Sequence, residues 1–350
     1  MYLKIYNRSR TKVVNEIEIY ESLRFESDRI GGFTTCEFEV KRDVLRKQSD
    51  LQVYNQVDVC EGARTPWEGY VYEPAKTSPV GLMVPCSGWS GLWTEVPIEA
   101  EQPAQKMSTF ILAMLADPDI SPFVTEGLID TSDYDSPPAT DGVLPGQYYA
   151  DSLSDYNKWN DWRYYHGEGR RLYFNPPKTV AKWIVLSEDA PGFQIADSPA
   201  NFWNRVVYKY TAIDGVHYDS VFDADSIAEF ERTVTKIIEI PGITTDVQAA
   251  HYATVYLSRG KSMTVMGQLT TSTIYDATTM NPASLWKVRG GDVLKVQDFL
   301  FPPTGNVVDE VTTFEIKTVQ YVRKPKSITI TPKDWDSGLE ATWAKLDSRD

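Results

Sequence analysis

Residues that could support nucleophilic catalysis are scattered along the sequence. Such catalysis needs a serine or cysteine within reach of a histidine base. The chain holds three histidines, His166, His217 and His251, and none has a nucleophile near it in a recognisable pattern. The segment 87–91 (SGWSG) is only superficially like a nucleophile elbow, because no parallel-sheet pattern surrounds it. We therefore predict no catalytic residue of this kind.

Two pairs of carboxylates could serve acid–base catalysis on glycosidic bonds. Asp223 and Asp225 stand directly before an expected helix start, where acidic side chains complement the helix dipole. Asp133 and Asp135 lie in the segment 130–146, whose Asp, Pro, Ser and Gly content is typical of a long loop with solvated turns. A glycosidase that uses Asp133 and Asp135 stays an alternative, but the favoured interpretation is a protein that is not an enzyme.

Aromatic side chains gather in two short stretches and could stack on sugar rings. They are Trp89, Trp93, Trp159 and Trp162. Aromatic rings also fill the cores of small domains, because each buries a large apolar area. The core role is the simpler interpretation, and a glycan-binding, receptor-recognition module is the main alternative.

No motif in the sequence predicts a cofactor or a metal. Cys36, Cys60 and Cys86 are far apart and lack the spacing of a zinc site, so we expect buried free thiols. The segment 289–292 (RGGD) lacks the Lys-Ser/Thr end of a phosphate loop and is expected to form a tight β-turn. We also expect no signal peptide and no stable membrane insertion, since no apolar run approaches the roughly 20 residues that span a bilayer.

The charge balance argues against a surface built to neutralise phosphates. The 350-residue chain has a formal net charge of −14 at pH 7, and its Lys and Arg doublets are isolated. Nucleic-acid-binding proteins usually carry a basic patch or stripe. We therefore predict no specific binding of nucleic acid. Acidic surfaces keep proteins soluble, and they also suit a passage that DNA must cross without adhering.

The elements that carry these residues are mainly β-strands. Aromatic residues make up 12% of the chain and favour pleated sheets. In the segment 33–40, the polar residues Thr35, Glu37 and Glu39 alternate with less polar ones, which is the two-residue period of a half-buried strand. At least five strands fall within about the first 75 residues, the spacing of a small barrel or sandwich.

The segment 204–240 combines strands, a hairpin and one helical turn. Its Asp-Gly pair at 214–215 supplies the positive-φ residues of a tight hairpin. Ser226 and Glu229 predict a capping box that starts a short helix, and we place Ile227 of that helix in the protein core.

Further helices are expected in two places. The segment 79–179 should hold an amphipathic helix that ends before Asp117, a second helix over 147–159 and a hairpin that turns at 166–169. A later helix should begin at a capping box of Thr245 and Gln248, pack small residues on a sheet and end at Gly260 in the C′ position.

These elements predict a mainly β fold with an α+β insert: two β-barrel or sandwich domains plus a small helix-hairpin insert. We expect the first barrel in residues 1–78 and about 180–212, the insert in 79–179, the second barrel with one helix in 213–332, and a polar C-terminal tail in 333–350.

Short motifs give the chain a resemblance to a known family. They are the run from Asn204 to Val206, the run from Asp223 to Ile227 with Asp225 and Ser226, the Ala-rich helix from Gln248 to Leu257, the run from Arg289 to Leu294 with Gly291 and Asp292, and the insert from Tyr148 to Pro176. The chain resembles, from Tyr2 to about Ile330, the tail hub proteins of tailed bacteriophages, which include the T-even baseplate hub and the late-control protein of temperate phages. It departs from the family at Phe230-Glu231, where an aromatic-Gly pair is frequent.

The resemblance implies two tube-type β-barrels with inserted α/β modules. Three copies would form a ring of six barrels that adapts the hexameric tail tube to a threefold tip. It thus implies a structural virion protein, assembled in the host bacterial cytoplasm, that acts as a homotrimeric hub at the distal tail end and lines the DNA-ejection channel. The implied partners are further copies of the chain, the tail tube or distal tail protein ring, a tail spike or fibre and the tape-measure protein. The acidic charge balance agrees with a channel for DNA.

Overall fold

The structure, a computed structural model, describes residues 1–18, 20–41, 51–79, 81–103, 105–133, 143, 145–190, 196–198, 202–261, 264–297 and 312–333. The strands in chain order are β1 (Tyr2–Tyr6), β2 (Val13–Ile17), β3 (Ser22–Asp28), β4 (Gly31–Val40), β5 (Gln56–Glu61), β6 (Arg64–Val71), β7 (Lys76–Thr77), β8 (Leu82–Gly88), β9 (Thr125–Ile129), β10 (Arg163–Gly167), β11 (Arg171–Asn175), β12 (Trp183–Leu186), β13 (Ala196–Ser198), β14 (Arg205–Ala212), β15 (Gly215–Phe222), β16 (Thr235–Ile243), β17 (Thr264–Met266), β18 (Leu269–Thr271), β19 (Tyr275–Asp276), β20 (Val293–Gln297), β21 (Thr312–Val322) and β22 (Ser327–Pro332). The α-helices are α1 (Met107–Leu115), α2 (Tyr149–Asn160), α3 (Ala224–Phe230) and α4 (Asp246–Gly260).

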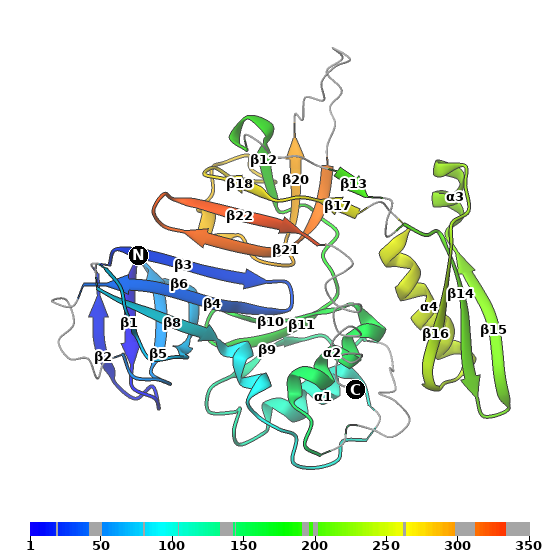
Figure 1. Cartoon of the computed structure of the whole chain (residues 1–350), viewed down its shortest axis with the longest axis horizontal. Coiled ribbons are helices and arrows are strands. Elements are labelled where there is room, and N and C mark those ends of the chain that lie inside the picture. Colours follow the sequence, from blue (N-terminus) through cyan, green and yellow to red (C-terminus); the bar gives the residue numbers. More distant parts are fainter. Residues whose placement is uncertain are drawn as a thin grey trace.

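Most of these strands belong to one continuous sheet. Hydrogen-bonded neighbours follow the order β2–β1–β5–β6–β8–β4–β3–β21–β22–β18. β20 pairs with β21, and β12 pairs with β20 and β19. The antiparallel pair β3–β21 therefore joins the first strands of the chain to the last ones, which lie side by side in Figure 1 in blue and orange-red.

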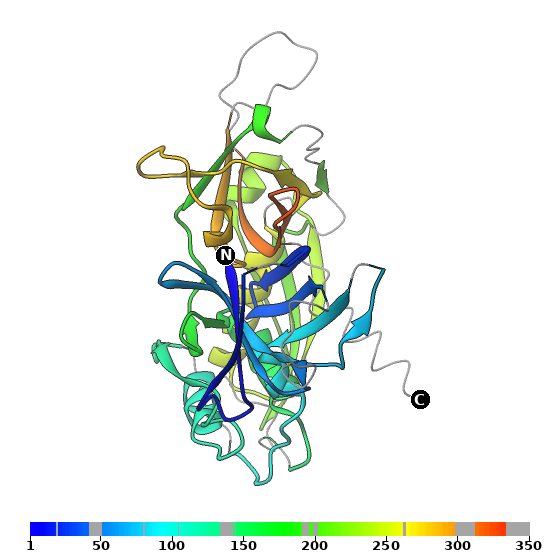
Figure 2. The same ribbon diagram turned by 90° about the vertical axis from the view of Figure 1, so that its left-hand side faces the viewer.

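The prediction of a mainly β fold with a helical insert is confirmed. Among the described strands, the series of paired strands ends at two edge strands, β2 and β18. These pairings therefore close no barrel. Closure into tube-type barrels and the predicted domain boundaries therefore stay predictions. Figure 2 shows the strands β20–β22 above the N-terminal strands, with the helices of the insert below them.

The first hydrophobic core is shared by the two ends of the chain. Leu3, Phe38 and Trp67 come from the first strands, and Val319 and Ile330 come from the last ones. Strict alternation of buried and half-buried residues along β22 directs its apolar side chains to this core. Each fully buried side chain of this size contributes about 1.5–3 kcal/mol relative to an exposed one. Since one core holds both ends, we expect the two groups of strands to fold together.

The insert has a core of its own. Phe110 of α1 packs against Tyr156 of α2, with ring centroids 5.0 Å apart, and Phe174 of β11 belongs to the same cluster. The insert joins the large sheet through the parallel pair β10–β4. A Cβ atom at Gly32 of β4 would lie 2.2 Å from the backbone oxygen of His166, so this pairing requires glycine.

A third core lies between α4 and the three-stranded sheet β15–β14–β16. Val206 and Tyr208 of β14 are buried beneath Ala249, Ala253 and Leu257 of α4. The expected packing of small helix residues on a sheet is thus confirmed. The capping box of Thr245 and Gln248 at the start of α4 is confirmed as well, and so is the hairpin at 214–215. Of its two turn residues only Gly215 has a positive φ, at +137°, so the expectation that Asp214 shares this conformation was wrong.

The helix α3 starts at a different residue from the expected one. The N-cap is Asp223, whose side chain accepts a hydrogen bond from the backbone N–H of Ser226, and the Ser226 hydroxyl donates to the carbonyl of Lys261. The predicted capping box with Glu229 was therefore wrong. Ile227 is half-buried on α3 and does not lie in a core, which corrects its expected placement.

Gly260 also has a different role from the expected one. It is the last helical residue of α4, and Lys261 forms the C-cap with right-handed φ and ψ. A Cβ atom at position 260 would lie 2.0 Å from the Trp203 ring. Glycine is required here because Trp203 packs directly on the helix backbone, and not because the helix needs a left-handed cap.

Candidate assembly and channel surfaces

A buried polar joint holds the large sheet, the insert and the α4 unit together, where the α4 unit means α3, α4 and the sheet β15–β14–β16. Arg29, between β3 and β4, donates from Nε to Glu315 of β21 at 2.8 Å and from Nη2 to the carbonyl oxygen of Asp161 at 2.6 Å. Asp161 caps α2 in the left-handed conformation and pairs with Lys333, which follows β22, at 2.8 Å. Arg259 of α4 lies 3.8 Å from the same carboxylate. Four distant segments therefore meet at one carboxylate.

The charges in this joint compensate one another. Burial alone would raise the pKa of Asp161, but the positive charges of Arg29, Arg259 and Lys333 outweigh it and hold that pKa well below its usual range. Removing one partner of a buried pair leaves an uncompensated charge, which is strongly destabilising. The joint thus fixes the insert and the α4 unit relative to the sheet.

The RGGD turn is a second junction, and the expected β-turn is confirmed by the hydrogen bond from the Asp292 N–H to the Arg289 carbonyl. The Asp292 carboxylate is 1% exposed and accepts from Trp183 Nε1 at 2.8 Å and from Lys178 Nζ at 2.7 Å. Gly291 has a φ of +78°, and its carbonyl accepts from an Arg163 side chain of the insert at 2.8 Å. Gly291 and Asp292 therefore act in packing.

The other predicted motif residues lie in the α4 unit. Asn204 is fully buried, accepts from the Val234 N–H and donates to the Arg232 carbonyl, both at 2.8 Å, so that it ties β14 to the entry of β16. Ser226 and Asp225 lie in the first turn of α3, where Asp225 is exposed. The structure thus brings Asn204 and Ser226 into one unit and places Gly291 and Asp292 in another.

Three of the four tryptophans proposed for sugar stacking are in cores. Trp89, Trp93 and Trp159 are 1%, 3% and 6% exposed, so their rings offer no open face in this conformation. Trp93 packs on His166, with ring centroids 4.7 Å apart. Trp162 is half-buried and lines a hollow beside α4. Glycan stacking therefore stays a prediction that rests on Trp162.

The carboxylates proposed for glycosidase chemistry have local structural partners. Asp133 is 2% exposed and accepts from the backbone N–H and the hydroxyl of Ser108 in the first turn of α1, at 3.1 and 2.6 Å. It thus satisfies a free donor at a helix start. Asp135 lies outside the described residues. Asp223 caps α3 and pairs with Lys261.

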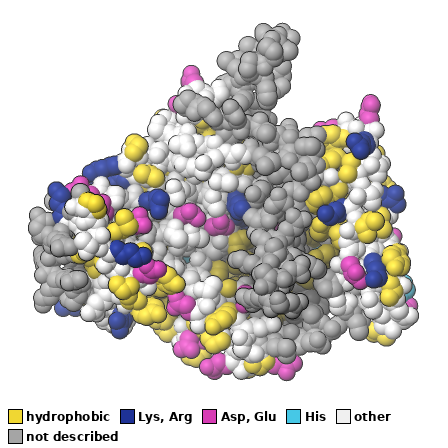
Figure 3. Space-filling view, viewed as in Figure 1, with side chains coloured by type: hydrophobic (Ala, Val, Ile, Leu, Met, Phe, Trp, Pro, Cys, Tyr) yellow, Lys and Arg dark blue, Asp and Glu magenta, His cyan; other side chains and the backbone are white. Residues whose placement is uncertain are grey.

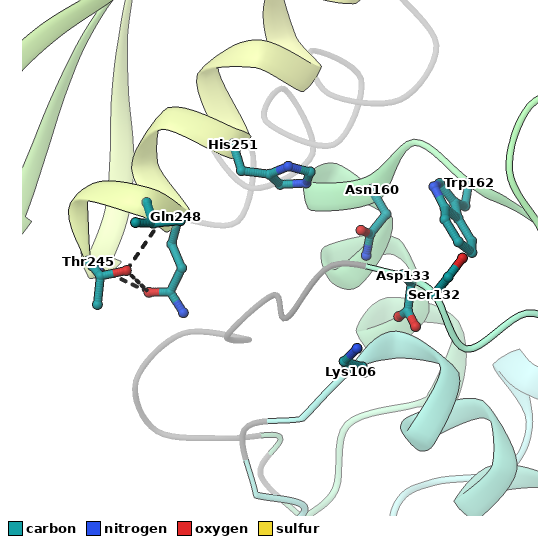
Figure 4. Close-up of a pocket in the computed structure, with 9 residues that line it drawn as sticks. Lys106, Ser132, Asp133, Asn160, Trp162, Thr245, Gln248 and His251 are labelled. Carbon is teal, nitrogen blue, oxygen red and sulfur yellow. Dashed lines mark hydrogen bonds between the residues drawn. The ribbon is translucent and has the colours of Figure 1, made fainter.

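A hollow of about 490 Å³ lies between the insert and α4. Figure 4 shows Asp133 and Trp162 on the insert side and Gln248 and His251 on the α4 side. Gln248 belongs to the capping box, and His251 lies 3.1 Å from the carbonyl oxygen of Trp159. Burial lowers the pKa of His251. These groups are held by local structure, and they do not form a set of nucleophile, base and stabilising donor.

A buried carboxyl, Glu68, attaches the tip of the insert hairpin to β6 in a way that the sequence did not indicate. Its two oxygens accept from the backbone N–H groups of Gly169 and Arg170 at 2.9 and 2.7 Å. It stands opposite Asp58, which pairs with Arg10. Burial, and then the charge of Asp58, raise the pKa of Glu68 to about 7 in spite of those hydrogen bonds. The sequence alone gave no signal for this contact, because the opposition of Glu68 and Asp58 depends on the pairing of β5 with β6.

Between β18 and β4, the continuous sheet carries polar side chains on the side that faces away from the first core. One row of cross-strand partners runs from β18 to β3 through Thr270, Thr329, Gln320 and Glu26. The hydroxyls of Thr270 and Thr329 lie 3.1 Å apart. This row crosses the β3–β21 seam without an apolar side chain, and none of its four members is buried.

Beside this row lie Arg24 of β3 and Glu37 and Glu39 of β4. Arg24 is opposite Glu37 in register, with Nη2 and Oε1 3.7 Å apart. We call the seven residues of the row and its neighbours the polar face. It carries three carboxylates and one guanidinium, so it repels phosphate groups and lacks the basic cluster that would hold them.

Some features are absent from the part of the chain that the structure describes. No group of three or more His, Cys, Asp and Glu side chains there could hold a metal ion. Among the described helices, none is long and apolar enough to cross a membrane. The three cysteines are described, free and buried, which confirms the expectation from their spacing.

Comparison of the fold with solved structures finds tail proteins. The 43 kDa tail protein of prophage MuSo2 from Shewanella oneidensis matches with a TM-score of 0.64 and 14% identity, over 96% of this chain and 99% of that one. A tail protein from Neisseria meningitidis MC58 matches with a TM-score of 0.64 and 12% identity, over 96% and 97% of the two chains. Prophage tail protein gp18 from Listeria monocytogenes EGD-e matches with a TM-score of 0.61 and 10% identity, over 99% of each chain.

Searches by sequence add nothing to this result, since no family model and no curated protein matches the chain. The likeness is therefore one of fold. It extends across the N-terminal strands, the insert, the α4 unit and the C-terminal strands alike. Over nearly its whole length, this chain has the fold of phage tail proteins, as the motifs in its sequence implied.

Proposed function

We propose that the chain is a structural virion protein of a phage tail, a homotrimeric hub that lines the DNA-ejection channel with its polar face. The observation that carries this proposal is the continuous sheet, which crosses the β3–β21 seam and carries the polar face, with three carboxylates and one guanidinium, from β18 to β4. The fold shared with prophage tail proteins supports it.

The two groups of strands suit an adaptor between different symmetries. Each chain presents one strand group from its start and one from its end, joined edge to edge at β3–β21. Three copies would therefore present six groups, which is the number needed to meet a sixfold tube while keeping a threefold tip. A closed ring would also cover sheet edges, which otherwise invite uncontrolled pairing. The proposed partners are further copies of the chain, the tail tube or distal tail protein ring, a spike or fibre and the tape-measure protein.

The channel role depends on charge. DNA passing through the ring would meet hydroxyls, an amide and three carboxylates against a single guanidinium, which is paired with Glu37, so this surface would not hold its phosphates. Glu26→Lys combined with Glu37→Lys should turn this surface into one that holds DNA, with retention by the ring about tenfold stronger at low salt. Glu99→Lys combined with Glu229→Lys makes the same change in net charge at exposed sites away from the polar face.

Retention of linear duplex DNA on filters measures this effect. Stronger retention by the polar-face variant than by its control supports the channel assignment. Equal retention by the two variants shows that net charge alone matters, and it contradicts the assignment.

Glycan binding is the second candidate function, and the position of Trp162 in the hollow beside α4 is what favours it. Titration with host surface glycans should then quench tryptophan fluorescence in the wild-type chain but not in Trp162→Leu. An unchanged emission in both proteins rules this candidate out.

A further inference from the structure

Among the residues that the structure describes, the three-stranded sheet β15–β14–β16 is covered on one side only. Its inner side packs on α4, whereas its outer side shows Val216, Tyr218 and Phe222 of β15 and Ile237 of β16. These side chains are 52%, 71%, 62% and 75% exposed. Figure 3 shows the hydrophobic side chains gathered at the right-hand edge of the molecule, over this unit.

Strand register places these side chains on one continuous surface. Phe222 is opposite Arg205 of β14, and Tyr218 is opposite Lys209. Val207, which stands between those two β14 residues, is opposite Ile237 in the parallel pair. We call the surface of Val207, Lys209, Arg205 and the four exposed apolar residues the outer face.

The composition of the outer face is that of a protein interface. Large exposed apolar patches with a polar rim mark interaction sites on soluble proteins. Aromatic residues and arginine are enriched where binding energy concentrates, and Tyr218, Phe222 and Arg205 supply both types. We therefore expect the exposed side of this sheet to bind a partner.

The charges on the outer face indicate which partner. Lys209 pairs with Glu239 of β16 at 2.7 Å, which leaves Arg205 as the excess charge, and this charge is positive. The chain as a whole carries a net charge of −14, so its other surfaces supply the complement. We propose that the outer face docks a second copy of this chain. This inference rests on the trimeric assembly of the proposed function.

The strand β9 has the chemistry to meet the outer face in the neighbouring copy. Among the described strands β9 pairs only with β11, so it is an edge. It carries an exposed carboxylate, Glu126, and an exposed apolar side chain, Leu128, which is 65% exposed. A ring of identical chains needs two different complementary surfaces on each chain. The outer face and β9 are such a pair, with Arg205 toward Glu126 and Tyr218 or Ile237 toward Leu128.

The first test removes the apolar contact. Tyr218→Asp with Ile237→Asp places two charges in the outer face, and both side chains are exposed enough that the fold should be unaffected. Val180→Asp, at a 78% exposed apolar residue elsewhere, is the control. Light scattering should give a trimer for the wild-type chain and for the control, and a monomer for the double variant with unchanged melting. If the double variant melts earlier, Tyr218→Ser with Ile237→Thr keeps strand-compatible residues and repeats the measurement.

The outcomes separate this inference from the function on which it depends. A wild-type trimer that persists in both outer-face variants overturns the docking surface and leaves the hub proposal standing. A wild-type chain that stays monomeric at every concentration overturns both. A trimer that persists while the variants fail to enter assembled tails assigns the outer face to a different tail protein, and this result also overturns docking of a second copy.

The second test addresses β9. Reversing one charge, by Arg205→Glu or by Glu126→Arg, should raise the concentration at which the trimer dissociates about tenfold. Reversing both charges in one chain should return this concentration to the wild-type value. No recovery in the double reversal overturns β9 as the mating surface.

Discussion

Glu68 shows how one side chain couples protonation to structure. Its carboxyl is 2% exposed and holds the hairpin turn at Gly169 and Arg170. Because burial raises its pKa from an ordinary value near 4.5 to about 7, the folded protein binds this proton more tightly than the unfolded chain does. The resulting stabilisation is fully present below about pH 4.5 and is lost as the pH rises through 7.

Glu68→Gln should flatten the pH dependence of stability. Other groups oppose Glu68 in the wild-type chain, since burial lowers the pKa of His166 to about 3 and that contribution is lost as the pH falls from about 6.5. The useful quantity is therefore the difference in unfolding free energy between wild type and variant. It should shift in favour of the variant by on the order of 3 kcal/mol between pH 4.5 and 8.

Urea unfolding at several pH values measures this difference. Glu229→Gln, on the exposed side of α3, is the matched control and should give a constant difference. A constant difference for Glu68→Gln as well would mean that the Glu68 carboxyl is ionised throughout this range.

The buried Asp292 carboxylate of the RGGD turn should contribute to the stability of the fold. Asp292→Ala leaves the buried indole N–H of Trp183 without its acceptor and should destabilise the protein by about 2–3 kcal/mol. Asp225→Ala removes an exposed carboxylate and should change stability by less than about 0.5 kcal/mol. Thermal melting compares the two variants, and equal melting temperatures would show that the Asp292 network contributes little.

Local sequence patterns predicted the elements whose causes are local. The hairpin at 214–215 and the capping box of Thr245 and Gln248 depend on backbone geometry within a few residues, and both are present. The N-cap of α3 was assigned to the wrong residue because the Ser226 hydroxyl donates its hydrogen bond to the distant carbonyl of Lys261 instead. Tertiary contacts of this kind leave no periodic signal.

At the scale of one helix, Gly260 shows most clearly how a tertiary contact determines a residue whose cause looked local. Its glycine was attributed to a helix end, but the reason is Trp203 packed on the helix backbone. Gly260→Ala should therefore destabilise the α4 unit by about 1–3 kcal/mol, although alanine is the better helix former. Ser258→Ala, on the exposed side of the same helix, is the control. A gain in melting temperature for Gly260→Ala would contradict the packing account.

The site residues show the same division between local and distant causes. The acidic alternation of Glu37 and Glu39 is readable from the sequence, whereas its continuation through Gln320 and Thr329 depends on a strand pair that joins residues about 300 positions apart. The joint at Arg29 and Asp161 was not predicted either, because its members come from five distant segments.

At the scale of the whole molecule, the β3–β21 seam makes the two ends of the chain one folding unit. Phe25 and Tyr321 stack across it, with ring centroids 4.7 Å apart. Phe25→Ala should cost about 3–5 kcal/mol. Hydrogen exchange should then show amide protection falling together in β1–β5 and in β20–β22. Loss confined to β3 and β4 would mean that the two strand groups are stable independently.

The claim on which the functional account depends is that three chains form a closed ring. Native mass spectrometry of the full-length protein, with averaged electron micrographs of the same sample, tests it directly. We expect a species of three times the 39.6 kDa chain mass that appears as a threefold ring with an open centre. A single-chain mass at micromolar and higher concentrations, or a closed particle without a central opening, would contradict it.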